Sequence, residues 1–251
     1  MAELEGKRVL VTGSGAGIGK AIATLFTERG ARVVVSDIDA ETAEKAAAEI
    51  GAAGVANCDV TDEAQVQAAV ARAVEILGGL DVLVNNAGIE ISSPLLQQST
   101  ESFERIHAVN VRGPFVAMKA AIPHLMESRG NVVNIASIAG LGGSPLLGSY
   151  CASKAALIQM TRVAAVEMRP TGVRFNAVCP GFADTAMVER LVPDFEAATQ
   201  VPFGDLVAQK QGRLGTPTDI AEVAAFLASD RASWVTGSAY VLDGGLSASL
   251  V

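Results

Sequence analysis

The chain has 251 residues, half of them hydrophobic, which suffices for a sizeable core in one large α/β domain or two small ones, and we predict one. Its 27 acidic and 19 basic residues give a net charge of −8, and no basic cluster interrupts that balance, so nucleic acids and anionic membranes are disfavoured as partners. No apolar run reaches the roughly 18 residues of a membrane span, and MAELEGKRVLVT is acidic where a signal peptide is basic, so we expect a cytoplasmic protein that acts on small molecules.

Seven short apolar runs, each bounded by turn residues, are typical of buried parallel strands. They cover residues 8–11, 32–36, 54–57, 81–84, 131–135, 173–178 and 239–242. Between them, Ala-rich stretches carry apolar residues at helical spacing, and several open with an Asp, Ser or Thr that can cap a helix. These predicted helices cover residues 19–29, 41–50, 63–77, 101–126, 149–168 and 218–228.

The regular alternation of strand and helix predicts a doubly wound parallel sheet of seven strands in a single domain, with helices on both faces. One segment, residues 184–213, interrupts the alternation and is rich in Pro, Phe and charged residues. It is longer than a usual connection between a strand and a helix. We therefore predict that it forms a lid or substrate loop.

A glycine-rich turn, in VLVTGSGAGIGKAIA, follows the first predicted strand and opens the first predicted helix. This arrangement brings a pyrophosphate against backbone N–H groups at a helix N-terminus, where a Cβ would hold the phosphate away. Its glycines, Gly13, Gly17 and Gly19, have the spacing G-x-x-x-G-x-G rather than the more familiar G-x-G-x-x-G. A purely structural turn remains the alternative.

Asp37 ends the second predicted strand, where a carboxylate can accept hydrogen bonds from the hydroxyls of an adenosine ribose. A 2′-phosphate there would face a like charge, and Ser36 and Ile38 supply no cation, so NAD is favoured over NADP. Alternatively, Asp37 caps the following helix, although Asp39 could serve as that cap.

The stretch YCASK places Tyr150 one helical turn before Lys154, so that both side chains emerge on the same face of a helix. A free phenol, with a pKa of about 10, is a poor proton carrier at neutral pH. A cation about 4 to 6 Å away at an effective dielectric constant of about 20 would lower that pKa by roughly two to three units. Chance spacing in an Ala-rich helix is the alternative.

The motifs TGSGAGIG, NNAG at 85–88, Asn110, Ser137, YCASK and PGFADT at 180–185 occur in this order. With them, the chain resembles the short-chain dehydrogenase/reductase family over essentially its whole length. The resemblance implies a catalytic set of Asn110, Ser137, Tyr150 and Lys154. Ala183 departs from the larger aliphatic residue that the family often has there, which affects the shape of the expected nicotinamide pocket and not the chemistry.

The resemblance also implies where a dinucleotide would bind. The implied cofactor residues are Gly13, Ser14, Gly17, Ile18 and Gly19 at the pyrophosphate, Asp37 at the ribose, Asp59 and Val60 at the adenine, Asn86, Ala87 and Gly88 beside the adenosine ribose, and Tyr150, Lys154, Pro180, Gly181 and Thr185 at the nicotinamide end. Simpler roles are open for several of them, because Asn and Gly often make only turns, Thr185 can cap a helix, and any of Asp59, Thr61 and Asp62 can cap the next one.

Hydride transfer to or from a carbinol carbon requires a proton to move at its oxygen. Tyr150 suits that acid/base role, Lys154 would lower its pKa, and Ser137 can donate to the substrate oxygen. By resemblance, Asn110 holds a water that links Lys154 to solvent, although a mid-helix Asn could also face solvent. His107 and His124 are isolated, and we leave them out of the site. The three cysteines, Cys58, Cys151 and Cys179, are odd in number and form no C-x-x-C pair. We therefore predict buried thiols and neither disulfides nor a metal site.

The substrate wall should come from the stretches after Gly88 and Ser137 and from the lid segment. Its candidates are Glu90, Leu141, Leu147, Phe182 and Met187. Their mostly apolar character favours a hydrophobic ketone or secondary alcohol, with Glu90 free to contact a polar substituent; packing of the lid is the alternative. By resemblance, we also expect a homotetramer formed through the helices that carry Asn110 and Tyr150.

An NAD-dependent oxidoreductase for a small secondary alcohol or ketone is therefore the leading hypothesis. The nearest alternative is an NADPH-dependent 3-oxoacyl-[acyl-carrier-protein] reductase, which Asp37 disfavours. A non-catalytic dinucleotide-binding sensor is an alternative from another class, and it would not need Ser137, Tyr150 and Lys154 together.

Overall fold

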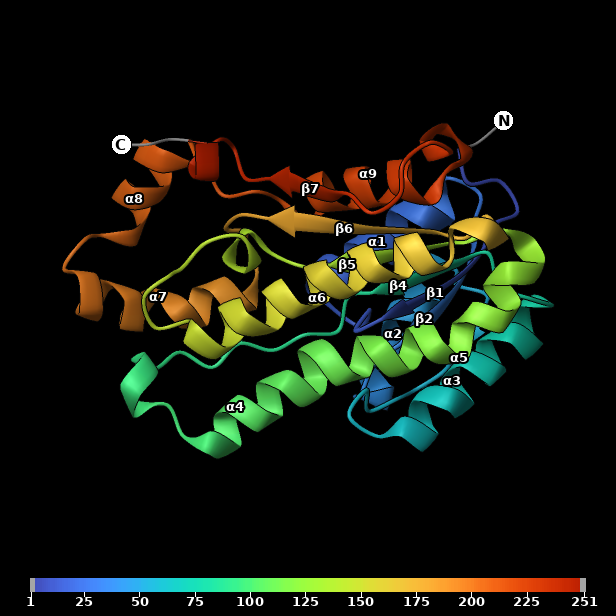
Figure 1. The fold of residues 1–251 in the computed structure, drawn as a ribbon, viewed down its shortest axis with the longest axis horizontal. Coiled ribbons are helices and arrows are strands. Elements are labelled where there is room, and N and C mark those ends of the chain that lie inside the picture. The colour runs from blue at the N-terminus through green and yellow to red at the C-terminus, as the bar shows by residue number, and fades with distance from the viewer. Residues whose placement is uncertain (1–2, 249–251) are drawn as a thin grey trace.

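The computed structural model describes residues 3–248, and its centre is a single parallel sheet (Figure 1). Its seven strands lie in the order β3-β2-β1-β4-β5-β6-β7. They are β1 (Arg8–Thr12), β2 (Arg32–Ser36), β3 (Gly54–Val55), β4 (Val82–Asn85), β5 (Asn131–Ile135), β6 (Arg174–Pro180) and β7 (Ala239–Leu242). All seven predicted strands are present, and the doubly wound fold is confirmed.

Nine α-helices within residues 3–248 connect and cover the strands. They are α1 (Gly17–Glu28), α2 (Ala40–Ile50), α3 (Glu63–Leu77), α4 (Thr100–His107), α5 (Gly113–Ser128), α6 (Gly148–Glu167), α7 (Ala186–Thr199), α8 (Phe203–Lys210) and α9 (Pro217–Ala228). Helices α1, α2 and α9 pack on one face of the sheet, and α3, α5 and α6 pack on the other. No helix of the described part is long and apolar enough to cross a bilayer.

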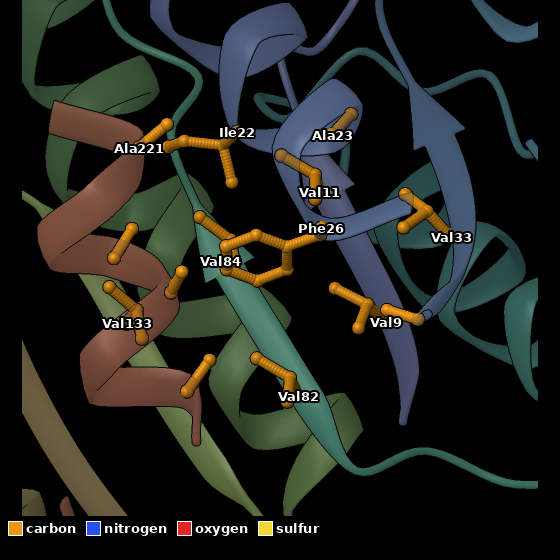
Figure 2. Close-up of a cluster of buried hydrophobic side chains, with 14 of the residues drawn as sticks. Val9, Val11, Ile22, Ala23, Phe26, Val33, Val82, Val84, Val133 and Ala221 are labelled. Carbon is orange, nitrogen blue, oxygen red and sulfur yellow. The ribbon is translucent and has the colours of Figure 1, made fainter. Parts of the chain in front are cut away.

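The core on the α1 face forms because the central strands are apolar on both sides, as strands between two helical layers must be. Figure 2 shows Phe26 of α1 among Val9 of β1 and Val82 and Val84 of β4, and all four are fully buried. Helix α9 closes this cluster with small residues such as Ala221, which lets it lie close to α1. This packing fixes α1, and with it the glycine-rich turn, against the sheet.

The sheet order reverses between β1 and β4, which are neighbours although they are far apart in the chain. After β1 the chain continues to one face of the sheet, and after β4 it continues to the other. A crevice therefore opens between the carboxyl ends of these two strands. The glycine-rich turn follows β1 and the NNAG motif follows β4, so both border this crevice.

The predicted helix over residues 101–126 is two helices in the structure. A π-helical turn, Ala108–Arg112, separates α4 from α5, and Asn110 lies within it. Such turns are frequent at functional sites. Apolar periodicity alone does not reveal this turn.

The segment 184–213, predicted as a loop, contains α7 and α8. Pro193 lies inside α7 although proline normally breaks helices, which is why the composition of the segment indicated a loop. Apolar residues at helical spacing, including Leu191, Phe195 and Val207, bury themselves in a separate small core. Figure 1 shows α7 and α8 at the end of the molecule toward which β6 and β7 point.

Candidate active site

Two cavities meet at the carboxyl ends of the strands. The glycine-turn cavity, of about 700 Å³, extends along the glycine-rich turn and is bordered by Gly13 and Asp37. The lid cavity, of about 720 Å³, lies under α7 and α8 and is bordered by Leu147 and Phe195. Tyr150 borders both cavities, so a group held in one can reach a group held in the other at this side chain.

The N-terminus of α1 is open toward the glycine-turn cavity. Its N-cap is Ala16, which offers no side-chain hydrogen bond, and the first turn holds no acidic residue. By contrast, α2 and α3 begin at aspartates, Asp39 and Asp62, whose carboxylates accept the free N–H groups. The unpaired N–H groups and the positive end of the helix dipole of α1 are therefore available to an anion such as a pyrophosphate.

Close backbone contacts fix the glycine-rich turn. A Cβ on Gly13, whose φ is +60°, would lie 2.8 Å from Cα of Ala87, so only glycine fits there. The side-chain amide of Asn86 donates to the carbonyl oxygens of Thr12 and Gly13, at 3.0 and 2.8 Å. The Asn86 side chain of the NNAG motif thus holds the turn from the neighbouring strand.

Most of the predicted cofactor residues border the glycine-turn cavity. Those that do are Gly13, Gly17, Ile18, Asp37, Asp59, Val60, Asn86, Ala87, Gly88, Tyr150, Lys154, Pro180, Gly181 and Thr185. Their binding roles stay predictions, but the structure brings them to one place.

Ser14 and Gly19, the two other predicted cofactor residues, do not border the cavity, and their binding roles also stay predictions. The Ser14 hydroxyl donates to the carbonyl of Val11 at 2.7 Å and accepts from the N–H of Ser36 at 3.1 Å, so this fully buried residue ties β1 to β2. Gly19 lies where α1 crosses the turn, and a Cβ there would be 2.2 Å from the carbonyl oxygen of Gly13. Both residues support the turn from behind.

Asp37 does not cap the following helix, because Asp39 accepts the capping hydrogen bond from the N–H of Thr42 at 2.8 Å. The Asp37 carboxylate instead accepts a hydrogen bond from the N–H of Gly15 at 2.9 Å and borders the cavity. Within residues 3–248 no cation forms an ion pair with it. The position therefore suits a neutral hydroxyl and opposes a phosphate.

Asp59 and Thr185 make local hydrogen bonds and also border this cavity. Asp59 accepts hydrogen bonds from the N–H and hydroxyl of Thr61, each at 2.8 Å, while Asp62 caps α3. The Thr185 hydroxyl accepts a hydrogen bond from the N–H of Val188 at 3.4 Å and so caps α7, which is the alternative role that the sequence left open. Both Asp59 and Thr185 nevertheless border the cavity, so capping does not remove them from it.

Tyr150 and Lys154 lie one turn apart on α6, with the ammonium of Lys154 5.6 Å from the centre of the phenol ring. Lys154 is buried, and its Nζ donates to the carbonyl of Ile135 at the end of β5 at 2.8 Å. Ser137 follows β5 and lies near the phenol, and its hydroxyl also accepts from the N–H of Ala139 at 3.1 Å. The carboxyl end of β5 and the first turns of α6 thus assemble this trio.

Burial changes the proton affinities of this trio in a direction that the sequence did not predict. It raises the pKa of Tyr150 to about 12, while the Ser137 hydroxyl acts in the opposite direction. Burial also lowers the pKa of Lys154 to about 8. In the protein without a bound cofactor, the pKa of the phenol is therefore raised and not lowered as predicted. The prediction counted the charge of Lys154 and omitted the loss of solvation.

Asn110 is fully buried and does not face solvent. Its Oδ1 accepts from the N–H of Ile89 at 2.9 Å, and its Nδ2 donates to the carbonyl of Ile89 at 2.9 Å and to the hydroxyl of Ser153 at 3.0 Å. The side chain therefore holds the loop after β4 against α6. Its contact with a water that serves Lys154 stays a prediction.

All five predicted substrate-wall residues border the lid cavity. They are Glu90, Leu141, Leu147, Phe182 and Met187. The sequence missed several further wall residues from α7 and α8, such as Leu191, Phe195 and Leu206, because their helical spacing was not separated from a loop rich in Pro and Phe. It also missed Arg105, Arg112 and Arg190 beside the glycine-turn cavity, for which no local motif exists.

The prediction that the cysteines are buried thiols is confirmed for two of the three. Cys58 and Cys179 are buried and Cys151 is partly buried. Burial raises the pKa of both Cys58 and Cys179 to about 11, so these two thiols stay protonated near neutral pH.

The comparisons with known proteins agree with this geometry. Residues 13–247 match the sequence model of a family described as enoyl-(acyl carrier protein) reductase. The chain is 41% identical over 251 residues to 2-(S)-hydroxypropyl-CoM dehydrogenase 3 of Xanthobacter autotrophicus, with 98% of each chain covered. It is 38% identical over 250 residues to 3-oxoacyl-[acyl-carrier-protein] reductase FabG of Thermotoga maritima, covering 97% of this chain and 98% of that one.

A solved structure has the same architecture. A short-chain type dehydrogenase/reductase from Mycobacterium marinum superimposes with a TM-score of 0.90 at 34% identity, and the match covers 98% of both chains. At this identity and coverage the likeness extends over the whole fold.

Proposed function

The chain belongs to the short-chain dehydrogenase/reductase family and is an oxidoreductase that acts on CH–OH groups, and from this we propose that it exchanges a hydride between NAD(H) and a small, largely apolar secondary alcohol or its ketone. The observation that carries the proposal is the position of Tyr150, which borders the glycine-turn cavity and the lid cavity at once. A proton donor at that junction is placed for chemistry between a cofactor and a substrate.

The glycine-turn cavity fits a dinucleotide. The uncapped N-terminus of α1 suits its pyrophosphate, and Asp37 suits the hydroxyls of its adenosine ribose. A Cβ on Gly88 would lie 3.4 Å from both the Lys154 Nζ and the Asn110 Oδ1, so glycine keeps the space beside these groups open. A bound nicotinamide supplies the hydride chemistry that no side chain of this protein can supply.

The residues of the protein manage the proton. In alcohol oxidation Tyr150, as the phenolate, removes the proton of the substrate hydroxyl, and in ketone reduction its phenol returns a proton to the developing alkoxide. Ser137 donates a hydrogen bond to the same substrate oxygen and stabilises charge there. Lys154, held by the carbonyl of Ile135, favours the phenolate while its ammonium is protonated, which its lowered pKa of about 8 allows at neutral pH.

The preference for NAD is tested by measuring kcat/KM for ketone reduction with NADH and with NADPH. We expect NADH to be preferred by about a hundredfold, because a 2′-phosphate would meet the Asp37 carboxylate with like charge. The variant Asp37→Ser should reduce that preference to a few fold. A preference for NADPH in the unmodified protein would refute the choice of cofactor.

The reduction of 3-oxoacyl thioesters is a second candidate, because a relative of that activity is 38% identical over almost the whole chain. Acetoacetyl thioester reduction by NADPH, measured beside the reduction of simple ketones by NADH, separates the two. Turnover of the thioester with NADPH as the faster reaction would favour the second candidate. The absence of turnover with every ketone and alcohol tested would favour a non-catalytic nucleotide sensor.

Assembly as a homotetramer in the cytoplasm is part of the same proposal. Exposed apolar side chains on helices α4, α5 and α6 support it, among them Phe103, Phe115, Val163 and Val166. Light scattering coupled to gel filtration should give four times the mass of one chain, and a monomer at micromolar concentration would contradict the proposal.

A further inference from the structure

Glu90 is an anomaly in the lid cavity. Every other described residue of its wall is neutral, and most are apolar. The Oε1 atom of Glu90 is buried and has no hydrogen-bond partner within residues 3–248. A buried carboxylate oxygen without a donor costs free energy, and a donor supplied by water or by a bound molecule removes that cost.

The backbone that precedes Glu90 is held by hydrogen bonds. The preceding residue, Ile89, has both its N–H and its carbonyl bonded to the side chain of Asn110, at 2.9 Å each. Asn110 is in turn bonded to Ser153 on the helix that carries Tyr150. The backbone from which the Glu90 side chain emerges is therefore anchored to the helix that carries the phenol.

Charges around Glu90 decide which donor it suits. Burial raises its pKa, the positive charge of Arg190 lowers it, and Asp194 raises it. Arg190 faces Glu90 from α7 and would repel a cationic substrate, while Glu90 itself would repel an anion. A neutral donor meets neither obstacle, and on a small, largely apolar alcohol that donor is a hydroxyl.

Glu90 also lies close enough to Tyr150 for its charge to raise the pKa of the phenol. Both side chains border the same cavity as Ser137, which is expected to hold the reacting oxygen. A hydroxyl that reaches Glu90 thus belongs to the same small molecule as the carbinol at Tyr150, a few bonds away from it.

We propose that Glu90 is the specificity-determining residue of the lid cavity and accepts a hydrogen bond from a second hydroxyl of the substrate, so that the preferred substrates are neutral, largely apolar diols and the matching hydroxyketones. The proposal rests on the proposed function. It adds to it a substrate class, a second hydroxyl close to the reacting carbinol on an otherwise apolar frame.

The experiment compares cyclohexane-1,2-diol with cyclohexanol, which share one carbon frame and differ by one hydroxyl. The measured quantity is the ratio of their kcat/KM values for NAD-linked oxidation. We expect the unmodified protein to prefer the diol by about tenfold to a hundredfold, the range for a hydrogen bond to a buried charged group. The variant Glu90→Leu should bring the ratio to about one.

Two further variants keep the test decisive. Glu90→Gln preserves the shape of the side chain and removes its charge, so it should reduce the ratio even if Glu90→Leu does not fold. Glu104→Gln makes the same chemical change on the exposed surface of α4, away from both cavities, and should leave the ratio as in the unmodified protein.

Binding by isothermal titration calorimetry gives a readout that does not depend on turnover. The diol should bind the unmodified protein more tightly than cyclohexanol does, and Glu90→Gln should lose the difference. Equal ratios in all variants, or no diol preference in the unmodified protein, would overturn the role of Glu90 and would show that water alone satisfies this oxygen. Absence of turnover with both alcohols would overturn the proposed function instead, while the binding difference would still report on Glu90.

Discussion

The glycine-turn cavity is built mainly from backbone, whereas the lid cavity is built mainly from side chains. Around the first, a Cβ on Gly13 or Gly19 would collide with neighbouring backbone, and the N–H groups at the start of α1 are free to bind an anion. Around the second, Leu191, Phe195 and Phe182 form the wall from two segments that pack on each other. A backbone site tolerates few changes, while a wall of side chains can change its substrate without changing the fold.

The largest effect should come from Tyr150, where the two cavities meet. Tyr150→Phe removes the proton donor and leaves the ring, so we expect kcat to fall by about 10² to 10⁴-fold. The Kd of NADH, measured by fluorescence, should change little. The matched control is Tyr240→Phe, which alters the other tyrosine of the chain on β7 and should keep full activity. A Tyr150→Phe enzyme as active as the control would remove the phenol from the mechanism.

The dependence on pH comes next, and its sign follows from the raised pKa of Tyr150. Because burial raises this pKa to about 12, the phenol is mostly protonated at pH 7, and the phenolate that alcohol oxidation needs becomes more abundant as the pH rises. Oxidation should therefore accelerate between pH 7 and 9, by at most about tenfold per pH unit, and ketone reduction should not. Initial rates in both directions with saturating cofactor measure this. Oxidation that is flat or slower at pH 9 would contradict it.

The sequence predicted the sheet and the glycine-turn cavity because their signals are local. Each strand is a short apolar run, and the turn around Gly13 and the NNAG motif are each contiguous in the chain. Ser14 and Gly19 belong to the same turn but do not border the cavity, and both hold the turn against its neighbours. A motif identifies such residues as part of a turn and does not tell which side of the backbone faces the cavity.

The lid cavity was predicted less completely, for two physical reasons. Pro193 and the phenylalanines indicated a loop, but tertiary packing of Phe195 and Phe203 overrides the low helical propensity of this segment. The unpaired state of the Glu90 carboxylate depends on what surrounds it from α6 and α7, which no local pattern contains. The raised pKa of Tyr150 was missed for the same reason, because burial is a property of the whole fold.

The backbone character of the glycine-turn cavity is tested by Gly19→Ala. Its new Cβ would lie 2.2 Å from the carbonyl oxygen of Gly13, so α1 must shift away from the turn. We expect the free energy of unfolding to fall by about 2 kcal/mol, as in other overpacked sites, and NADH binding to weaken with it. Gly142→Ala is the control, because a Cβ there meets nothing within 4 Å. Urea unfolding measures both, and equal stabilities would show that the turn is more adaptable than the structure indicates.

The smallest predicted effect separates the two cavities most directly. Phe195 lies in α7, is buried, and packs edge-on against Phe203 with ring centres 5.7 Å apart while bordering the lid cavity. Phe195→Ala removes a ring from the wall and enlarges the lid cavity without changing the glycine-rich turn. KM for an apolar ketone should therefore rise by about tenfold, while the Kd of NADH stays unchanged. Val201→Ala, an exposed position between α7 and α8, is the control and should leave KM as it is. If the Kd of NADH rose together with KM, the lid cavity and the glycine-turn cavity would be coupled. The two regions would then differ in how they are built but not in what they bind independently.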